Sequence, residues 1–507
     1  MAVTVLSLIS YIFAVIFAAC FGCVLCFLAH LHYLHRINDH LPGPPRSSFI
    51  FGHLPEIRKY AVSTGRTLSE FLLEKQIEYG PIFVLFFLHK PMVFLADSNY
   101  LRHVFLNNHK NLYKSPFIYH KIGFIFGERG GGYGLVTNTD EVSWHTRRRL
   151  INPAFHRKCL KDFISKFNDV SDTFLARVDT LVDTSKPTSM VQEFGKVTLE
   201  VISQVSFNVN THAIEVPDSP FPIAVRHYLR GVQKNFEIPL SPTLLKIFQF
   251  KVFQNATIKK YIDAAQFIRK FALDCITTRM KDIDDGKPVP RDLLSVLIQG
   301  GSLPIDEIVD EFVTIFVAGQ DTTANTLSFA LYGIITNPHV EKKLLDEVNE
   351  ILGDRDYVGS EDLAKLKYLG QIIDETLRKY PVVQATSRVL AKEITVGGYQ
   401  IPKGNGINTV QLFFGMNPDV WERPELFDPE RFSDVSKMSN FSMIHFPFSI
   451  GLRNCIGQTF AKFELKIILA KLLRKFKFRL LPGQTDRIRA RVINTPRDGV
   501  MCDVTRR

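Results

Sequence analysis

The sequence predicts a mainly α-helical protein with small β-sheets and an N-terminal transmembrane helix. Three observations carry this prediction. An apolar stretch without a charged side chain opens the chain, from Ala2 to Ala29. A helical pattern of about 33 residues runs from Pro304 to Thr336, far longer than the usual globular helix. The segments with β-propensity are short and scattered among the helical patterns.

The N-terminal stretch is long enough to span a bilayer with some tilt. A cleaved signal peptide would need a basic start and a shorter apolar core, which this segment lacks. We therefore predict a retained signal anchor over residues 1–35 and a stiff, proline-rich linker over residues 36–48. Basic residues follow the span from Arg36 onward, so the positive-inside rule places the main body in the cytoplasm.

Residues 49–507 contain no repeat, low-complexity tract or charged linker, so we expect one large catalytic domain. The seven cysteines form neither a disulfide framework nor a zinc-ligand spacing, which is consistent with a reducing compartment. The net charge of +11 comes from residues spread through helical patterns, without a nucleic-acid motif. A nucleic-acid partner is therefore set aside.

Short β segments are expected in a hairpin over Ile82 to Ala96, turning at Lys90-Pro91, and at Ile394–Ile401, Phe478–Leu481 and Arg489–Ile493. The glycine-rich run at 130–134 lacks the Lys-Ser/Thr of a phosphate-binding loop, so we interpret it as a flexible loop. Residues 217–251 mix proline with large apolar side chains. Two helices joined by a proline-rich turn would expose that apolar surface, either as core or as a lid that dips into the membrane.

The centre of the long helix, Phe316 to Ala324, places an acid, hydroxyls and a glycine in an apolar sequence. A buried carboxylate such as Asp321 is costly unless it has partners or a function. The Thr322 hydroxyl can bond the carbonyl four residues back, and Gly319 weakens the helix, so a local bulge is expected. The alternative is an ordinary polar stripe on the helix.

Cys455 is the strongest candidate metal ligand. It ends a glycine-punctuated loop that begins at Phe448, and it precedes an apolar pattern with helical spacing. The free N–H groups of a helix start favour a thiolate, and a thiolate ligand suits an oxygen-activating haem. Gly451 permits a tight turn and Gly457 lets the backbone approach a flat ligand. The alternative is a buried structural thiol.

Two neighbours of this cysteine complete the hypothesis. Phe448 can cover the sulfur, and Arg453 is placed to pair with an anionic haem propionate. The string Phe448 to Gly457 resembles the haem-ligand signature of the cytochrome P-450 family, Phe-x-x-Gly-x-Arg-x-Cys-x-Gly, at every fixed position. The resemblance implies the cytochrome P-450 fold, haem b with Cys455 as axial ligand, and monooxygenation of a lipophilic substrate. It also implies NADPH as electron donor through a flavoprotein reductase, and an endoplasmic reticulum membrane location.

Further motifs resemble the same family. Asp321 and Thr322 match its oxygen-activation motif, which implies that they deliver protons. Trp144 and Arg148, one helical turn apart, match residues that bond a haem propionate, and Arg388 is the candidate for the second propionate. In a generic protein the Trp144–Arg148 pair would be a surface cation–π contact.

Glu375 and Arg378 stand three residues apart on one helical pattern and can pair. In the family such a pair joins the arginine of Pro-Glu-Arg-Phe, here Arg431, in a buried structural network. Two basic groups are either solvated helix faces or, by resemblance, the reductase-docking surface. They are Arg147, Arg148, Arg149, Arg157, Lys158 and Lys161, and Lys462, Lys466, Lys471, Arg474 and Lys475.

Among branches of the family, several short segments resemble cholesterol 24-hydroxylase, which implies a sterol substrate. Gln384 and Ser387 stand where that branch carries bulky aromatic residues, so fatty acids or xenobiotics remain alternatives. Three other classes stay open: a haem-thiolate isomerase that needs no reductant, a haem sensor without turnover, and a membrane scaffold without haem.

Overall fold

In the computed structural model, residues 2–182, 184, 186–238, 241–301 and 303–507 are described. The chain folds as two compact units. Unit 1 contains the residues up to Leu112 together with Thr386–Val410, and unit 2 contains Tyr113–Ala385 and Gln411–Arg507.

Unit 1 combines helices with a small mixed sheet. Its helical elements are α1 (Ala2–Asn38), α2 (Leu54–Thr64), α3 (Leu68–Tyr79), α4 (Ser98–Leu101), the π-helix η1 (Arg102–Asn107) and the 3₁₀ helix η2 (His109–Asn111). Its strands are β1 (Ile82–Phe87), β2 (Lys90–Leu95), β3 (Leu112–Tyr113), β7 (Ala385–Leu390), β8 (Ile394–Val396), β9 (Tyr399–Ile401) and β10 (Gly406–Val410). The main sheet has the order β1-β2-β10-β7-β3, with β2 and β10 parallel.

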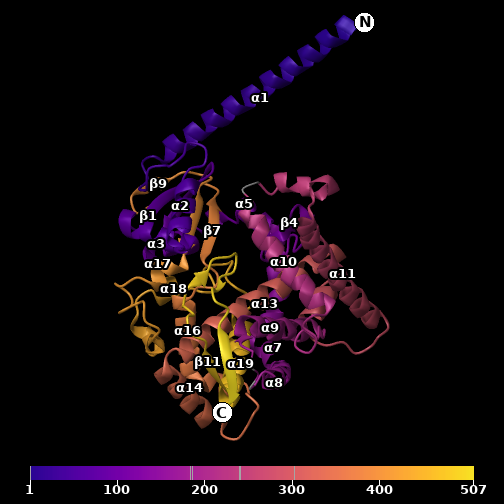
Figure 1. Ribbon diagram of the computed structural model, residues 1–507, viewed down its shortest axis with the longest axis vertical. Coiled ribbons are helices and arrows are strands. Elements are labelled where there is room, and N and C mark those ends of the chain that lie inside the picture. The colour runs from indigo at the N-terminus through magenta and orange to yellow at the C-terminus, as the bar shows by residue number, and fades with distance from the viewer. Residues whose placement is uncertain (1, 183, 185, 239–240, 302) are drawn as a thin grey trace. The chain divides into compact units, whose positions relative to one another are not determined.

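Helix α1 has two distinct parts. Figure 1 shows it extending away from the rest of unit 1. The span from Ile9 to Asn38 has a mean hydropathy of 2.8, and by length and composition it can cross a membrane. The last turns are different: Leu31 and His35 are buried, and the Asn38 amide oxygen accepts a hydrogen bond from Asn405 at 2.5 Å. The end of α1 is therefore part of the folded unit.

The predicted hairpin over residues 82–96 is confirmed as the antiparallel pair β1 and β2. Its turn was placed wrongly. The chain turns at Leu88 and His89, where Leu88 has a φ of 57°, and Pro91 lies in β2 opposite Phe86. The predicted strand region at 394–401 is confirmed as the hairpin of β8 and β9.

Unit 2 is mainly helical. Its longer helices are α5 (Pro116–Gly123), α6 (Glu141–Ile151), α8 (Ile164–Asp179), α9 (Met190–Phe207), α10 (Pro220–Glu237), α11 (Ala256–Asp284), α12 (Leu293–Gln299), α13 (Ile305–Ile335), α14 (Pro338–Leu352), α16 (Lys367–Lys379) and α19 (Gln458–Lys475). Its shorter helical elements are η3 (Asn152–Phe155), α7 (Arg157–Lys161), η4 (Leu244–Gln249), η5 (Lys251–Phe253), α15 (Asp362–Lys365), α17 (Gln411–Gly415), η6 (Pro429–Phe432), η7 (Val435–Lys437) and α18 (Phe441–Ile444).

The sheets of unit 2 are small, as expected. They are β11-β14-β6 (Phe476–Leu480, Met501–Arg506, Thr188–Ser189), β12-β13 (Ile488–Arg489, Thr495–Pro496) and β4-β5 (Phe124–Ile125, Glu128–Arg129). The strand predicted at Phe478–Leu481 is confirmed in β11. The one predicted at Arg489–Ile493 is wrong in extent, because β12 ends at Arg489 and the next residues form the tip of the β12–β13 hairpin.

The long central helix is confirmed as α13, which runs through the middle of unit 2 (Figure 1). It begins after Pro304 and ends at Ile335, as the sequence predicts. It packs against α9, α11, α16 and α19, so most of its side chains are buried. A helix that is apolar on nearly all sides is stable only at the centre of a folded body.

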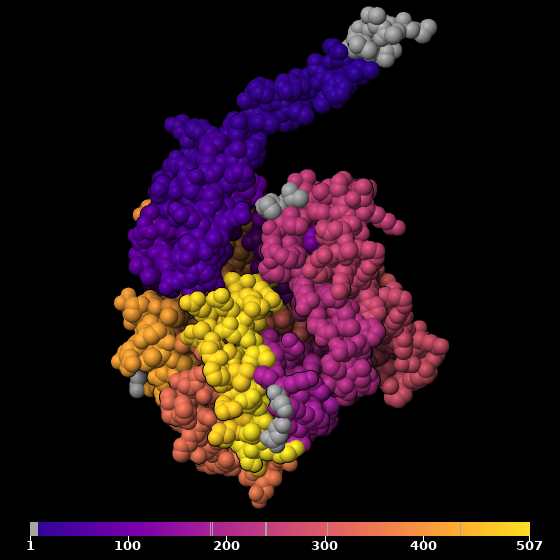
Figure 2. Space-filling model, in the orientation of Figure 1, coloured from indigo at the N-terminus to yellow at the C-terminus, as the bar shows by residue number. Residues whose placement is uncertain are grey.

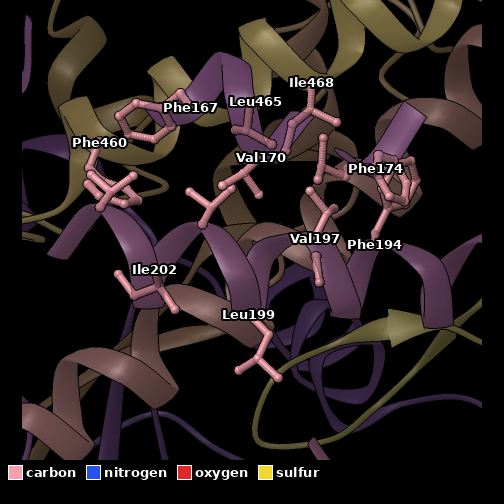
Figure 3. Packing of buried hydrophobic residues seen from close by; sticks show 14 of the residues in the cluster. Phe167, Val170, Phe174, Phe194, Val197, Leu199, Ile202, Phe460, Leu465 and Ile468 are labelled. Atoms are coloured by element: carbon pink, nitrogen blue, oxygen red, sulfur yellow. The ribbon is translucent and has the colours of Figure 1, made fainter. Parts of the chain in front are cut away.

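The main core joins α8, α9 and α19. Figure 3 shows their apolar side chains packed together: Phe167, Val170 and Phe174 from α8, Phe194 and Val197 from α9, and Phe460, Leu465 and Ile468 from α19. Leu199 and Ile202 leave the other side of α9. The Phe167 and Phe460 rings meet edge to face with centroids 4.9 Å apart. This contact fixes the start of α19, and with it the loop that carries Cys455.

The glycine-rich segment at 130–134 is not the flexible loop that the sequence suggested. Four of its five residues are buried, and the Gly131 N–H donates to the Tyr228 hydroxyl at 3.0 Å. A Cβ at Gly134 would lie 2.0 Å from the Thr314 hydroxyl oxygen. The glycines are therefore required by close packing against α13.

Residues 217–251 were expected to form two helices joined by a turn, and only α10 lies within them, followed by the short 3₁₀ element η4. The second long helix, α11, begins only at Ala256 and lies beside α10 in unit 2 (Figure 1). The short elements η4 and η5 between them lie on the surface (Figure 2). Their exposed apolar side chains are Leu244, Ile247, Phe250, Val252 and Phe253. This is surface, and the alternative of buried core is wrong for these five residues.

Candidate active site

Cys455 lies in a closed loop directly before α19. Its N–H donates to the Phe448 carbonyl at 2.9 Å, and Gly451 makes the turn with a φ of 75°. Gly457 is the N-cap of α19, so Cys455 stands two residues before the cap. The predicted loop and the predicted helix start are both present.

The Cys455 sulfur faces a space inside unit 2. The side chain is exposed, yet desolvation by the surrounding protein raises the pKa of its thiol. The Gly457 N–H and the positive charge of Arg148 oppose that shift. Both observations hold together only when the sulfur borders an internal space rather than bulk water.

Arg148 on α6 supports the cysteine loop. Its guanidinium donates to the Asn454 carbonyl at 2.7 Å and to the Asn454 side-chain oxygen at 3.0 Å, and burial lowers its pKa. The cation–π contact with Trp144 that the sequence suggested for Arg148 is made by Arg453 instead. Its guanidinium carbon lies 3.8 Å from the centre of the Trp144 ring, and it also donates to the Asn138 carbonyl.

Trp144 is buried on the same helix, and its indole N–H makes no hydrogen bond to any residue that the structure describes. A buried indole N–H usually finds a partner. The three side chains Trp144, Arg148 and Arg453 thus form one cluster around the loop that carries Cys455.

The centre of α13 supplies the second part of the site. The Thr322 hydroxyl donates to the Ala318 carbonyl at 2.8 Å, the bond that the sequence predicts. The expected bulge is absent, because α13 is continuous through Gly319 and Thr322. Burial raises the pKa of Asp321 to about 6, while Arg491 and the Asn325 amide oppose the shift.

Accessibility along α13 shows which part of the helix borders the internal space. Within a buried helix, five central residues are partly exposed: Val317, Ala318, Gly319, Asp321 and Thr322. Their neighbours Phe316, Gln320 and Thr323 are buried. The partly exposed residues at the centre of α13 therefore include the predicted acid and hydroxyl.

Glu464 was missed by sequence reasoning. It lies on α19, is 1% exposed, and no hydrogen bond of ordinary geometry reaches either carboxyl oxygen from the described residues. The nearby Thr323 hydroxyl lowers its pKa, but desolvation is larger and holds that pKa well above its usual range. The signal was available, because an acid inside an apolar helical pattern is costly.

Glu375, Arg378 and Arg431 come together as a buried network. Arg378 donates to both carboxyl oxygens of Glu375, at 2.6 and 2.8 Å, and Arg431 lies 3.6 Å from the same carboxylate. Arg378 also donates to the carbonyls of Gly415, Pro424 and Leu426. These contacts tie α16 to the chain that leads to the cysteine loop.

Arg388 is the one predicted site residue that belongs to unit 1. It lies in β7, is buried, and donates to the Ser387 carbonyl at 2.7 Å. Gln384 belongs to unit 2, and its amide donates to the Arg491 carbonyl at 2.9 Å and to the Asn494 side chain at 2.7 Å.

The two basic groups divide into inward and outward members. Arg147 is buried and paired with Glu307 and Glu311, and Lys471 is buried and paired with Asp172. Five members keep an exposed position: Arg149, Arg157, Lys158, Lys161 and Lys475. Arg148, Lys462, Lys466 and Arg474 are partly exposed, so Arg147 and Lys471 are the members that burial removes from a docking surface.

The residues present fit a flat iron-containing group. Within the described residues no cluster of three or more His, Cys, Asp or Glu side chains could hold a metal ion. A Cβ at Gly457 would meet protein atoms only at 3.9 Å or beyond, so the backbone there leaves room beside the sulfur. A bound metal ion deprotonates a thiol that is otherwise held neutral by burial. Fold and site thus define the class of helical haem-thiolate proteins.

Comparison with known proteins gives the family. A family model described as "Cytochrome P450" matches residues 42–501, so the chain belongs to the cytochrome P450 family. Cytochrome P450 3A6 of Oryctolagus cuniculus is 28% identical over 454 residues, which cover 87% of this chain and 86% of that protein. Cytochrome P450 4d2 of Drosophila melanogaster is 28% identical over 468 residues, which cover 88% and 90%. The protein is accordingly a monooxygenase whose family carries haem on a cysteine thiolate.

Proposed function

We propose that this enzyme inserts one oxygen atom from O2 into a C–H bond of a lipophilic substrate, with electrons from NADPH through a flavoprotein reductase. The observation that carries the proposal is the desolvated Cys455 sulfur in its loop before α19, with the basic cluster of Arg148 and Arg453 around that loop. The resemblance of several short segments to cholesterol 24-hydroxylase favours a sterol as the substrate class.

In this proposal Cys455 would hold the haem iron through its sulfur, and Phe448 and Gly457 shape the loop around that sulfur. Trp144, Arg148 and Arg453 receive one haem propionate, and Arg388 receives the second. When bound, haem supplies the oxygen chemistry, and the protein supplies position and electrostatics. The clustered donors beside Asn454 support these roles, because guanidinium groups pair well with carboxylates.

Asp321 is the proposed proton source. With a pKa of about 6 its carboxyl exists in both protonation states near neutral pH, as a general acid requires. Thr322 is the proposed hydroxyl donor on the next position of α13, and its bond to the Ala318 carbonyl holds the side chain in one rotamer. Glu375, Arg378 and Arg431 have a structural role, supported by their buried contacts.

We place the protein in the endoplasmic reticulum membrane as a single-pass protein with a cytoplasmic catalytic domain over residues 49–507. The exposed apolar part of α1 supports the anchor, and the apolar surface of η4 and η5 supports a lid that touches the bilayer. The exposed basic residues Arg149, Arg157 and Lys158 support docking of an acidic reductase.

The proposal is tested with Cys455→Ala and Cys455→Ser in the full chain. We expect both variants to lose the carbon-monoxide spectrum of a thiolate-ligated haem, and to lose turnover that depends on NADPH and reductase. Cys502→Ala is the matched control, because Cys502 is buried in β14 and remote in sequence from the loop. Normal spectrum and turnover in Cys455→Ala would refute the assignment.

A further inference from the structure

Asn325 lies one helical turn after Asp321 on α13, so the two side chains share a face of that helix. Asn325 is buried, with 3% of its surface exposed. Its amide nitrogen donates to the Asp321 backbone carbonyl at 2.7 Å and to the Asp321 carboxyl at 3.2 Å. Asn325 is therefore a direct neighbour of the proposed proton source.

A bond from a polar side chain to the backbone is common along α13. The hydroxyls of Thr322, Thr326 and Ser328 each donate to the carbonyl four residues back, at 2.7 to 2.8 Å. Such a bond satisfies a polar side chain inside a helix and requires no further function. Asn325 differs from these residues because its amide also reaches a carboxyl group.

The oxygen of the same amide argues against a purely structural role. It is buried and accepts no hydrogen bond from any residue that the structure describes. A buried carbonyl oxygen without a donor costs free energy, and an apolar side chain of similar shape, such as leucine, would avoid that cost. The property that leucine lacks is the N–H donor beside the Asp321 carboxyl.

The bond to the backbone fixes which end of the amide faces the acid. The nitrogen donates to the Asp321 carbonyl, and a rotation that exchanged it for the side-chain oxygen would place two carbonyl oxygens against each other. Asn325 therefore offers the Asp321 carboxyl a donor and not an acceptor. A donor stabilises the carboxylate more than the protonated acid, and the Asn325 amide accordingly lowers the pKa of Asp321.

Two other influences act on the same carboxyl. Desolvation raises the pKa of Asp321 to about 6, and the charge of Arg491, between β12 and β13, lowers it. The buried acid of α19, Glu464, meets Thr323 instead. Within the part of the chain that the structure describes, Asn325 is the side chain that bonds the Asp321 carboxyl directly, so it also sets the direction in which the carboxyl points.

We propose that Asn325 is a positioning residue for Asp321: its N–H holds the carboxyl in one direction and stabilises the carboxylate that remains after the proton has left. Solvent returns a proton to that carboxylate before the next turnover. The inference rests on the proposed function of Asp321 as proton source, and it adds the residue that controls the ionisation of that acid.

The first test follows thermal unfolding of the haem-loaded full chain against pH. An acid with a raised native pKa stabilises the fold at low pH, and this stability is lost as the pH rises through that pKa. Asn325→Leu removes the donor and should raise the pKa of Asp321 further, so the interval of loss should extend upward by about one pH unit. In an Asp321→Asn background the same replacement should change the melting temperature equally at every pH.

The second test measures proton delivery itself. The rate of NADPH oxidation is compared in H2O and in D2O for the enzyme reconstituted with a reductase, with cholesterol as the probe. Asn325→Leu should raise the ratio of the two rates, because a poorly held acid makes proton transfer limit the rate more strongly. Ser328→Ala is the matched control for both tests. It removes a buried bond to the Ala324 carbonyl from the same helix, and it should leave the isotope ratio and the shape of the pH curve as in the wild type.

Two results would overturn the inference alone: an Asn325→Leu curve with the same shape as the wild type, or an isotope ratio that rises in Asp321→Asn but not in Asn325→Leu. An unchanged ratio in Asp321→Asn would overturn the proposed acid, and the inference with it. Asn325→Ala removes the same donor and replaces Asn325→Leu in both tests if that variant does not fold. The carbon-monoxide spectrum of each sample tests the haem-thiolate assignment separately.

Discussion

At the scale of single residues, desolvation sets the chemistry of the site. The Asp321 carboxyl has a pKa of about 6, where its usual value is 3.8, because α13 surrounds it with apolar atoms. Desolvation also raises the pKa of the Cys455 thiol. This thiol therefore stays neutral unless a positively charged partner stabilises the thiolate. Burial therefore favours the protonated form of both side chains, the Asp321 carboxyl and the Cys455 thiol.

Asp321 gives a prediction about stability. Between pH 4 and pH 6 the native carboxyl holds a proton that the unfolded chain has released, so the free energy of unfolding falls as the pH rises through this interval. The expected loss is on the order of 2–3 kcal/mol above pH 6. Asp321→Asn lacks this titration, so its melting temperature should exceed that of the wild type more at pH 8 than at pH 4.

Thermal unfolding of both proteins across this pH range measures the effect. Asp274→Asn is the control, because Asp274 lies on the exposed face of α11, and its curve should run parallel to the wild type. Parallel curves for Asp321→Asn and the wild type would show that Asp321 is not desolvated.

At the scale of elements, the glycine-rich loop and the network on α16 hold their neighbours in place by opposite means. The loop relies on close approach, and Gly134 lies against Thr314 and the Asp310 carbonyl. The network relies on fixed donors from Arg378 to carbonyls of three different residues. Both sets of contacts hold irregular segments of the chain in one conformation. Without these contacts the segments would gain conformational entropy by moving.

Gly134→Ala should lower the free energy of unfolding by about 3 kcal/mol or more, because the added Cβ would lie 2.0 Å from the Thr314 hydroxyl oxygen and 2.7 Å from the Asp310 carbonyl oxygen. Gly195→Ala is the matched control, since its Cβ would meet only the Gln320 side chain at an ordinary 3.6 Å. Denaturant unfolding of both variants checks the difference. Equal stability of the two would contradict the packed loop.

Arg378→Lys should cost roughly 2–4 kcal/mol, because one ammonium cannot replace a planar group that donates to Glu375 and to three carbonyls. The comparison is Arg479→Lys. Arg479 pairs with Asp503 at the surface, where 82% of its side chain is exposed, and its replacement should change stability by less than about 1 kcal/mol. Thermal unfolding and haem content of purified protein measure both, and a tolerated Arg378→Lys would remove the structural role.

At the scale of the whole molecule, α1 is both a candidate membrane span and a part of unit 1. Its exposed portion reaches the rest of the unit through Phe27, whose ring meets the His89 ring edge to face with centroids 6.2 Å apart, whereas Leu31, His35 and Asn38 are buried in the unit. Removal of residues 2–28 should release the protein from membranes and leave its thermal unfolding unchanged. Removal of residues 2–38 should also lower the melting temperature by several degrees.

Sedimentation with membranes and thermal unfolding separate the two effects. Equal melting temperatures for the two truncated proteins would contradict the packed end of α1. Membrane retention of the shorter truncation would instead point to η4 and η5 as a second membrane contact.

The sequence predicted the elements whose cause is local. α13 follows from its length and apolar pattern between Pro304 and Thr336, and the Cys455 loop follows from its glycines and the helix behind it. The hairpin turn at Leu88 was missed, because a non-glycine residue adopts a positive φ there and no turn residue marks it. The glycine run was misread, because close approach to α13 depends on residues almost two hundred positions away.

The sequence by itself determined the class of protein, because a string of fixed spacing around Cys455 is readable without any long-range contact. Only the tertiary structure decided that Arg453 rather than Arg148 stacks on Trp144, and that Gln384 braces the β12–β13 hairpin. The physical reason is that spacing along one helix or loop fixes local geometry. Desolvation and pairing depend on which distant segments pack around a side chain.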